Sequence, residues 1–325
     1  MQRTRIALLR GGSEDGFSVS LKTGASLLKS IDPADYEVVD VVITKAGEWL
    51  VRGQVRDPRS VLNQVDMVLI GLQGKSGEDG KVQRLIDTLG IPYTGSRAFP
   101  SLLTSNKAMT KDALKEHGVR TPDHMVVGRD VVPNLVGAVA SIMALFGPMY
   151  VVKPISGGLS VGTMYADNAL MLEQALRTSL SVYEQVLVEK FIEGPEATCG
   201  VIEKFRDQDL YALPVVEIQR DSPIFTHEEK YVNRKEHVCP GCLKLEEKKE
   251  IERLAKLAHT KLGLSHYSRA DFIVGKDGIY FLETNSHPDI AVDSLFAQAL
   301  EVVGSTHAEF IAHLLTLARG YKRGI

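Results

Sequence analysis

The chain lacks the features that mark secreted, membrane-spanning and nucleic-acid-binding proteins. Its 325 residues include three cysteines, an odd and low number that is typical of a reducing compartment rather than of a disulfide framework. No apolar run reaches the roughly 18–20 residues of a membrane span, and the apolar stretch near the start is too short for a signal peptide. The net charge of −3 gives no overall attraction to nucleic acid or to an anionic membrane. We therefore expect a cytoplasmic protein that binds neither nucleic acid nor membrane.

The sequence also lacks a complete zinc motif. CPGC at residues 239–242 is the one CxxC pair of the chain, whereas a structural zinc site needs four ligands. One histidine, His237, is close in sequence and does not complete the set. We interpret the CPGC motif as a turn between two elements.

What the sequence does contain is the pattern of an α/β protein without repeats. A hydrophobic share of 44% and a charged share of 24% are ordinary for a globular chain, and the length suits two or three subdomains. In the first hundred residues, predicted strands alternate with predicted helices, which indicates a parallel sheet with crossover helices. The predicted strands are 5–9, 37–44 and 67–71, and the predicted helices are 19–30 and 78–89.

The later elements are predicted from the same kinds of signal. A helix is expected from residue 101 onward, with a cap at Ser105 and Asn106. The run ADFIV-GKDG-IYFLE alternates on both sides of a glycine-containing turn, which predicts a β-hairpin. The remaining predictions are strands at 149–152, 184–189 and 211–216, and helices at 246–262 and 306–318.

Oxygen-bearing side chains gather on the predicted hairpin. Asp271 and Glu283 lie on its two strands, and Asn285 follows Glu283 on the same face because side chains alternate along a strand. Arg269 shares the face of Asp271 by the same rule. Two carboxylates about 4 Å apart repel by roughly 4 kcal/mol at an effective dielectric of about 20, and a hard cation such as Mg²⁺ between them removes this repulsion. The alternative is that Asp271 faces solvent while Glu283 pairs with Arg269, and spacing alone does not decide between the two.

Two further segments suit a nucleotide. The loop KPISGGLSVG at residues 153–162 has glycines that let backbone N–H groups turn toward phosphate oxygens, and a lysine that adds positive charge. It is neither a Walker A motif nor GxGxxG, and glycine-rich turns are common. The strand VLVEKFIEG at 186–194 can offer backbone groups to an adenine and a glutamate to a ribose, although it also suits a core strand with a charged end.

The chain resembles the ATP-grasp enzymes in six residues and in their order along the sequence: Lys107, Lys153, Glu189, Asp271, Glu283 and Asn285. More narrowly, the chain is similar to the D-alanine–D-alanine ligases over nearly its whole length. The matching motifs are GG-x6-VSL at 11–21, GEDGKVQ at 77–83, GIPYTGS at 90–96, NKxxxK at 106–111, VVKPxSxGxSVG at 151–162, VLVEKFIEGPE at 186–196, LPVVEI at 213–218, HEEKY at 227–231, SRADF at 268–272, FLETNxxP at 281–288 and SLF at 294–296.

The resemblance implies an α/β chain with the ATP-grasp fold. An N-terminal, Rossmann-like parallel-sheet domain is expected at residues 1–98. Two α+β lobes, at 99–187 and 188–325, are expected to clamp ATP between them, with the metal site in the second lobe. The resemblance also implies a homodimer that acts on small amino-acid substrates.

The resemblance further implies a role for each matching residue. Two lysines should bind the ATP phosphates, Lys107 and Lys153. Glu189 should hold the ribose hydroxyls, and three residues should lie at the adenine and the rest of the nucleotide: Lys190, Ile192 and Glu196. Two Mg²⁺ ions, which Mn²⁺ can replace, should be held by Asp271, Glu283 and Asn285. The catalytic set implied is Arg269 at the developing oxyanion or acyl phosphate, Lys230 at the transferred phosphate, Tyr231 and Ser160. The substrate-binding set implied is Glu78, Ser294, Leu295, Asp289 and Gly16.

The family's reaction has two steps. The carboxylate of the first amino acid attacks the γ-phosphate of ATP to give an acyl phosphate, and the amine of the second amino acid then displaces phosphate. Closure of a loop over the acyl phosphate excludes water. We expect the segment 219–237, which contains Lys230 and Tyr231, to be this lid.

Departures from the family pattern cluster around the first amino acid. Where the family has a glutamate that holds the ammonium group and then a histidine, this chain has Gly16 and Phe17. Four more positions differ, and they are Gln73, Leu159, Asp289 and Ile290. Glu14 or Asp15 could replace the missing carboxylate. The leading interpretation is a ligase that makes D-alanyl-D-alanine for peptidoglycan; the alternatives are an ATP-grasp ligase for another amino-acid or amine pair, and a nucleotide-binding protein without ligase activity.

Overall fold

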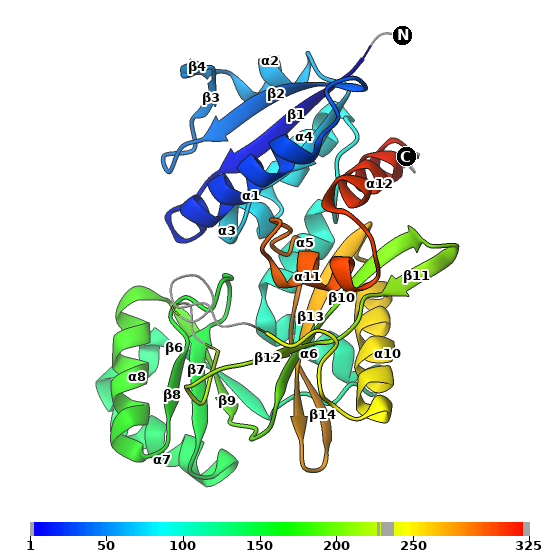
Figure 1. The fold of residues 1–325 in the computed structure, drawn as a ribbon. Coiled ribbons are helices and arrows are strands. Elements are labelled where there is room, and N and C mark those ends of the chain that lie inside the picture. The colour runs from blue at the N-terminus through cyan, green and yellow to red at the C-terminus, as the bar shows by residue number, and fades with distance from the viewer. Residues whose placement is uncertain (1–2, 226–227, 229–236, 321–325) are drawn as a thin grey trace.

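The computed structural model describes residues 3–225, 228 and 237–320 of the chain. Within these residues the fold is α/β and has three sheets with helices packed against them (Figure 1). One sheet belongs to the N-terminal part of the chain, one to the central part and one to the C-terminal part.

The N-terminal sheet has the strand order β4-β3-β2-β1-β5. β1 pairs in parallel with both β2 and β5, which confirms the predicted parallel sheet. Its apolar residues are buried on both faces, as expected for a central parallel strand. The hairpin of β3 and β4 was not predicted, because three-residue strands are too short to show alternation. The strands are β1 (Thr4–Gly11), β2 (Tyr36–Ile43), β3 (Trp49–Val51), β4 (Gln54–Arg56) and β5 (Met67–Ile70).

Two helices replace the single helix predicted at 78–89. Gly80 has a φ of 76° and separates them, and a Cβ at this position would lie 2.4 Å from the carbonyl oxygen of Ala98. Asn106 caps the next helix as predicted, since its side chain accepts a hydrogen bond from the Met109 N–H. The helices of this part are η1 (Glu14–Gly16), α1 (Phe17–Ser30), α2 (Pro58–Leu62), α3 (Lys75–Glu78), α4 (Lys81–Leu89), α5 (Ala98–Ser105) and α6 (Lys107–Lys115).

The central lobe is an antiparallel sheet with the order β6-β9-β7-β8. Because β9 belongs to this sheet, the lobe boundary expected after residue 187 falls inside a strand. The elements are β6 (His124–Gly128), η2 (Arg129–Asn134), α7 (Leu135–Phe146), β7 (Tyr150–Pro154), β8 (Met164–Ala166), α8 (Ala169–Val182) and β9 (Gln185–Lys190).

One segment of the central lobe, Arg129–Phe146, is long and apolar enough to cross a membrane by length and composition. Core helices of soluble proteins meet the same criterion. In this fold the segment forms η2 and α7, and its residues Leu135, Val139 and Ile142 pack in the core of the lobe.

The C-terminal sheet has the order β11-β10-β13-β14, and β12 also pairs with β10. The predicted hairpin is present as β13 and β14, with Asp271 opposite Glu283 and Arg269 opposite Asn285. The CPGC motif lies in bends after β12, and both of its cysteines are free thiols. The elements are β10 (Glu196–Phe205), β11 (Gln208–Ala212), β12 (Val216–Ile218), α10 (Leu245–Lys261), β13 (Tyr267–Gly275), β14 (Gly278–Asn285), α11 (Leu295–Val302) and α12 (His307–Gly320).

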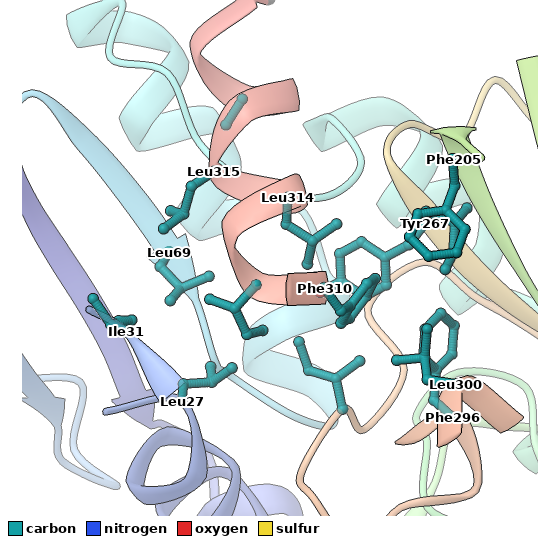
Figure 2. Close-up of a cluster of buried hydrophobic side chains, with 14 of the residues drawn as sticks. Leu27, Ile31, Leu69, Phe205, Tyr267, Phe296, Leu300, Phe310, Leu314 and Leu315 are labelled. Atoms are coloured by element: carbon teal, nitrogen blue, oxygen red, sulfur yellow. The ribbon is translucent and has the colours of Figure 1, made fainter. Parts of the chain in front are cut away.

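The N-terminal domain and the C-terminal lobe share one hydrophobic core, whereas the core of the central lobe is separate. Helix α12 lies at the centre of the shared core (Figure 2). Leu314 and Leu315 of α12 belong to the same cluster as Leu27 and Leu69 of the N-terminal domain. Aromatic residues extend the cluster into the C-terminal lobe, and they are Phe205, Tyr267, Phe296 and Phe310. The two parts are therefore packed as one body.

Polar contacts fasten the loop after β14 to the N-terminal domain. Asp289 accepts a hydrogen bond from the Thr23 hydroxyl at 2.8 Å, and the Val292 N–H donates to Ser26 at 3.0 Å. His287 is fully buried against Gly95, where an added Cβ would lie 2.3 Å from its Nε2. Asp289 is therefore turned toward α1, and its side chain also accepts from the Ala291 N–H.

We predict that acid destabilises the chain through His266 and His287. Burial lowers the pKa of each imidazole to about 4, below the unfolded value of 6.5. The stability that they contribute is present above pH 6.5 and is lost as the pH falls toward 4, by up to about 3 kcal/mol for each histidine. Urea unfolding at pH 7 and pH 5 should give a smaller drop in the free energy of unfolding for His287→Gln than for the unaltered chain.

The matched control is His117→Gln, because His117 is exposed at the end of α6. This variant should keep the drop of the unaltered chain. An equal drop in all three proteins would contradict the assignment.

Candidate active site

A pocket opens between the central sheet and the C-terminal sheet. Its walls come from β7 and β9 on one side and from β10, β13 and β14 on the other. Most of the residues predicted for the nucleotide and the metal line this one pocket: Lys107, Lys153, Glu189, Lys190, Ile192, Glu196, Asp271 and Glu283. Ser160, predicted to be catalytic, lines it as well. Apolar side chains complete the lining, among them Val151, Phe191, Phe225 and Ile273.

The predicted metal ligands converge at the end of the β13–β14 hairpin. Asp271 is buried, and its Oδ1 accepts hydrogen bonds from the Thr198 hydroxyl at 2.6 Å and from Arg269 Nε at 3.0 Å. Arg269 Nη2 donates to Oδ2 at 3.1 Å, and the Asn285 side chain lies 3.5 Å from the same oxygen. Asp271 therefore does not face solvent, as one alternative had it, and Arg269 is paired with Asp271.

These residues fit a hard divalent cation. Two carboxylates and one amide oxygen, on adjacent strands in register, are the donors that Mg²⁺ prefers. Oδ1 of Asp271 already accepts from Thr198 and Arg269. Oδ2 accepts from Arg269 at 3.1 Å and has only a 3.5 Å contact with Asn285, so Oδ2 is the oxygen that can bind a cation. The described residues hold no group of three or more His, Cys, Asp or Glu arranged for a metal, so this site depends on the amide of Asn285 and on ligand oxygens.

Lys107 joins the metal end to the glycine-rich loop. Its Nζ donates to the Gly157 carbonyl at 2.5 Å and lies 3.7 Å from Glu283 Oε2. Burial lowers the pKa of Lys107, and the nearby Glu283 opposes this shift. The lysine therefore lies between a metal ligand and the loop predicted to bind phosphate.

A buried charge triad forms the inner wall of the pocket. Glu189 is paired with Lys111 at 3.0 Å and with Lys153 at 2.9 Å, and all three side chains are almost fully buried. Burial acts to raise the pKa of Glu189, but the two lysines outweigh it and lower that pKa. Burial lowers the pKa of Lys111 to about 8, although Glu189 opposes the shift. Lys111 is part of the NKxxxK motif, and sequence reasoning gave it no role.

Arg220 was missed by the sequence analysis. Its Nη1 donates to Glu196 Oε2 at 2.9 Å, and its Nη2 donates to the Gly194 carbonyl at 3.0 Å. Both Glu196 and Arg220 line the pocket. No sequence signal pairs these residues, because 24 positions separate them and no periodic pattern connects them.

The glycine-rich loop has a backbone conformation that non-glycine residues rarely adopt. Leu159 and Ser160 have φ values of 61° and 56°. Gly157 and Gly162 also have positive φ, and Ser160 lines the pocket. Such strain is concentrated at functional sites, where it fixes backbone groups for a ligand.

The predicted substrate residues are more dispersed. Ser294 caps α11, since its hydroxyl accepts from the Ala297 N–H at 3.1 Å, and Leu295 packs against the shared core. Gly16 cannot carry a side chain without a shift of the backbone, because a Cβ would lie 2.3 Å from the carbonyl oxygen of Gln73. Glu78 is buried on the N-terminal side. The predicted catalytic residues Lys230 and Tyr231 lie outside the described residues, as does most of the predicted lid.

The fold and this pocket define the class of protein: an ATP-grasp enzyme that joins a carboxylate to an amine. The models of the D-ala D-ala ligase C-terminus and N-terminus match residues 113–316 and 52–96. The chain belongs to the D-alanine–D-alanine ligase family.

Relatives and solved structures agree with this membership. The D-alanine–D-alanine ligase of Geobacter sulfurreducens is 33% identical and matches over 98% of this chain and 95% of its own. A crystal structure of the Bacillus anthracis D-alanine–D-alanine ligase is 26% identical over 97% of both chains, with a TM-score of 0.79. A structure of D-alanine–D-alanine ligase from the same organism in complex with ATP has a TM-score of 0.77 over 97% of both chains, at 24% identity.

We predict that Lys111→Met destabilises the fold. The substitution removes one of the two cations that neutralise Glu189 and leaves a carboxylate with a single partner in a buried site. Breaking a buried ion pair costs about 3 kcal/mol or more. The free energy of unfolding, measured with urea, should fall by about this amount. Lys115→Met on the same helix is the control, because Lys115 is exposed; equal losses in the two variants would contradict the role of the triad.

Proposed function

We propose that the chain catalyses the ATP- and Mg²⁺-dependent ligation of two D-alanines to D-alanyl-D-alanine, which cells use in peptidoglycan. The observation that carries the proposal is the convergence of Lys107, Lys153 and the Asp271–Glu283 pair in one pocket of a full-length family member. Family members named D-alanine–D-alanine ligase, and the ATP complex of the Bacillus anthracis enzyme, support it.

The chemistry consists of two displacements. A carboxylate oxygen of the first D-alanine attacks the γ-phosphorus, and the bond to the β,γ-bridging oxygen breaks to release ADP. The amine of the second D-alanine then attacks the acyl carbon, releases inorganic phosphate and loses a proton. The protein contributes mainly positioning and electrostatic stabilisation to both steps.

Each wall of the pocket has its own part in this reaction. We place the phosphates between Lys107, at the start of α6 beside the glycine-rich loop, and Lys153 on β7. Asp271, Glu283 and Asn285 are the residues that would hold Mg²⁺, which would supply positive charge to the triphosphate. Arg269 lies within the same cluster and supplies positive charge to the acyl phosphate.

At the ribose end of the pocket, our assignment differs from the expectation from the sequence, which placed Glu189 at the ribose hydroxyls. Both oxygens of Glu189 are engaged by lysines, so we assign Glu189 to the positioning of Lys153. Glu196, oriented by Arg220, is the carboxylate that we place at the ribose hydroxyls. Lys190 and Ile192 remain our proposal for the adenine edge, and the N–H of Ile192 has no hydrogen-bond partner among the described residues.

A second candidate function is the ligation of a different amino-acid or amine pair. The absence of room for a side chain at Gly16, together with Leu159 in the glycine-rich loop, favours it. The reaction chemistry and the nucleotide site are the same for both candidates.

One experiment distinguishes the candidates. Phosphate release from ATP and Mg²⁺ is measured with single D- and L-amino acids and with pairs, and the products are identified by mass spectrometry. D-alanyl-D-alanine formed from D-alanine alone supports the first candidate. Turnover with another pair and none with D-alanine supports the second, and no turnover with any pair would overturn both.

We predict that Glu283→Gln lowers kcat at least a hundredfold. The amide keeps the size of the side chain and removes a negative charge that the Mg²⁺ site needs. Steady-state rates across a Mg²⁺ titration should show a higher metal requirement as well. Asp277→Asn, in the exposed turn of the same hairpin, is the control and should keep the normal rate. Full activity of Glu283→Gln would refute the metal assignment.

We also predict that Arg220→Met raises the KM for ATP about tenfold, because Glu196 loses the guanidinium that orients it; this is the scale of one charge-assisted hydrogen bond. The KM values for the amino acids should not change. Arg253→Met serves as the control, since Arg253 pairs with Glu250 on the exposed side of α10. Equal KM values for ATP in the two variants would refute the role of Arg220.

A further inference from the structure

Among the described residues, one buried carboxylate on the N-terminal side of the site has no hydrogen-bond or ion-pair partner. Glu78, the last residue of α3, is 7% exposed and makes no hydrogen bond or ion pair through its side chain with any described residue. Its carboxylate is directed at the glycine-rich loop, because a Cβ built on Gly158 would lie 3.3 Å from Oε2. A buried carboxylate without a partner is costly, and a ligand of positive charge removes the cost.

The electrostatic surroundings of Glu78 favour a bound cation. Burial raises the pKa of Glu78 to about 8; Lys107 opposes this shift, and the carboxylates of Glu283 and Asp15 add to it. Burial is the largest cause of this shift, so a cation bound beside Glu78 would stabilise the charged form of a carboxylate that the protein itself leaves poorly solvated. Because Glu78 also interacts with Glu283, its position connects the N-terminal side of the site with the reaction centre.

Asp15, in η1, is the second carboxylate on the N-terminal side of the site, which we call the N-terminal wall. Its Oδ1 accepts a hydrogen bond from the Ser13 hydroxyl at 2.5 Å, and its Oδ2 lies 3.4 Å from the Lys75 N–H. These two neutral donors orient the carboxylate and leave lone pairs for a ligand. Asp15 is half-buried and forms no ion pair with a described residue.

The backbone around Asp15 is tightly held against the segment that leads to Glu78. The Ser13 N–H donates to Ser76 Oγ at 2.7 Å, and a Cβ on Gly12 would lie 2.6 Å from the Ser76 side chain. A Cβ on Gly16 would likewise lie too close to its neighbour, at 2.3 Å from the Gln73 carbonyl oxygen. The loop can therefore present a carboxylate to the site from position 15 and not from position 16.

Glu14, the other carboxylate of the loop, is directed elsewhere. Its side chain is 78% exposed and is paired with Lys45. It therefore faces solvent and already has a cationic partner. This leaves Asp15 as the carboxylate of the loop that is available to a ligand.

We propose that Asp15 and Glu78 together bind the ammonium group of the first amino acid, the one whose carboxylate is phosphorylated. The inference rests on the proposed function and adds a residue that determines specificity. An ammonium group has three N–H donors, which suit two converging carboxylates. With the ammonium held on the N-terminal wall, the carboxylate of the same molecule is directed toward Arg269 and the metal end.

The kinetic test uses Asp15→Asn in the full chain. The KM of the first D-alanine site should rise about 10- to 100-fold, the scale of a lost charge-assisted hydrogen bond. The KM values for ATP and for the second D-alanine should stay unchanged, and kcat should change by less than about threefold. Asp15→Glu, which keeps the charge, should restore part of the loss. Glu14→Gln is the matched control and should behave as the unaltered chain.

A second measurement separates a direct contact from a structural effect. Lactate (2-hydroxypropanoate) has the carboxylate of alanine and lacks the ammonium, so its inhibition constant at the first site should be the same for Asp15→Asn and the unaltered chain. An equal weakening of lactate and D-alanine would mean that Asp15 only supports the fold of the loop, which would overturn the inference.

The inference and the proposed function fail in different ways. If dipeptide forms normally and Asp15→Asn keeps the KM of the first site, the inference is wrong and the function stands. If no dipeptide forms, the function is wrong, and calorimetric binding of D-alanine with ADP and Mg²⁺ decides the inference. Binding that Asp15→Asn weakens would support it, and absent binding, or binding unaffected by Asp15→Asn, would overturn it.

Discussion

The need to neutralise buried charge governs the arrangement of the active site. Glu189 is buried, and its two oxygens are held by Lys111 and Lys153. Since an unpaired buried charge is far more costly than a pair, each of these side chains constrains the other two. This triad fixes β7, β9 and α6 relative to one another, and it leaves Lys153 at the wall of the pocket with its charge available to phosphate. The same principle applies to Asp271 and Arg269 at the metal end.

The arrangement of the hydrophobic cores explains how the three parts of the chain surround the site. The N-terminal domain and the C-terminal lobe are fixed relative to each other, whereas the central lobe is built around a separate core. Helix α12 fills the space between the N-terminal sheet and the C-terminal lobe, so both belong to one core. The loop after β14 is tied to α1 through Asp289 and Val292. The central lobe, which carries Lys153 and the glycine-rich loop, has a core of its own. The pocket lies between that lobe and the combined body, which suits a site that must admit ATP and then exclude water.

The sequence predicted the parts of the site that depend on local geometry. Alternation and a short turn placed Asp271, Glu283 and Asn285 on one hairpin, and the structure has that register. Arg220 and Lys111 were missed because their partners are distant in sequence and come together only through tertiary packing. The direction of Asp289 was likewise not predictable, since it depends on Thr23 of the first helix. The short hairpin of β3 and β4 gave no periodic signal.

The central claim is that a substrate carboxylate is phosphorylated in this pocket before the amide bond forms. Transfer of oxygen from the substrate to phosphate tests it most directly. D-alanine labelled with ¹⁸O in its carboxylate is incubated with ATP, Mg²⁺ and the chain, and the released phosphate is analysed by mass spectrometry. The account predicts one ¹⁸O atom in each phosphate released with dipeptide. Unlabelled phosphate accompanying dipeptide would contradict it, because the carboxylate oxygen would then never have been bonded to phosphorus.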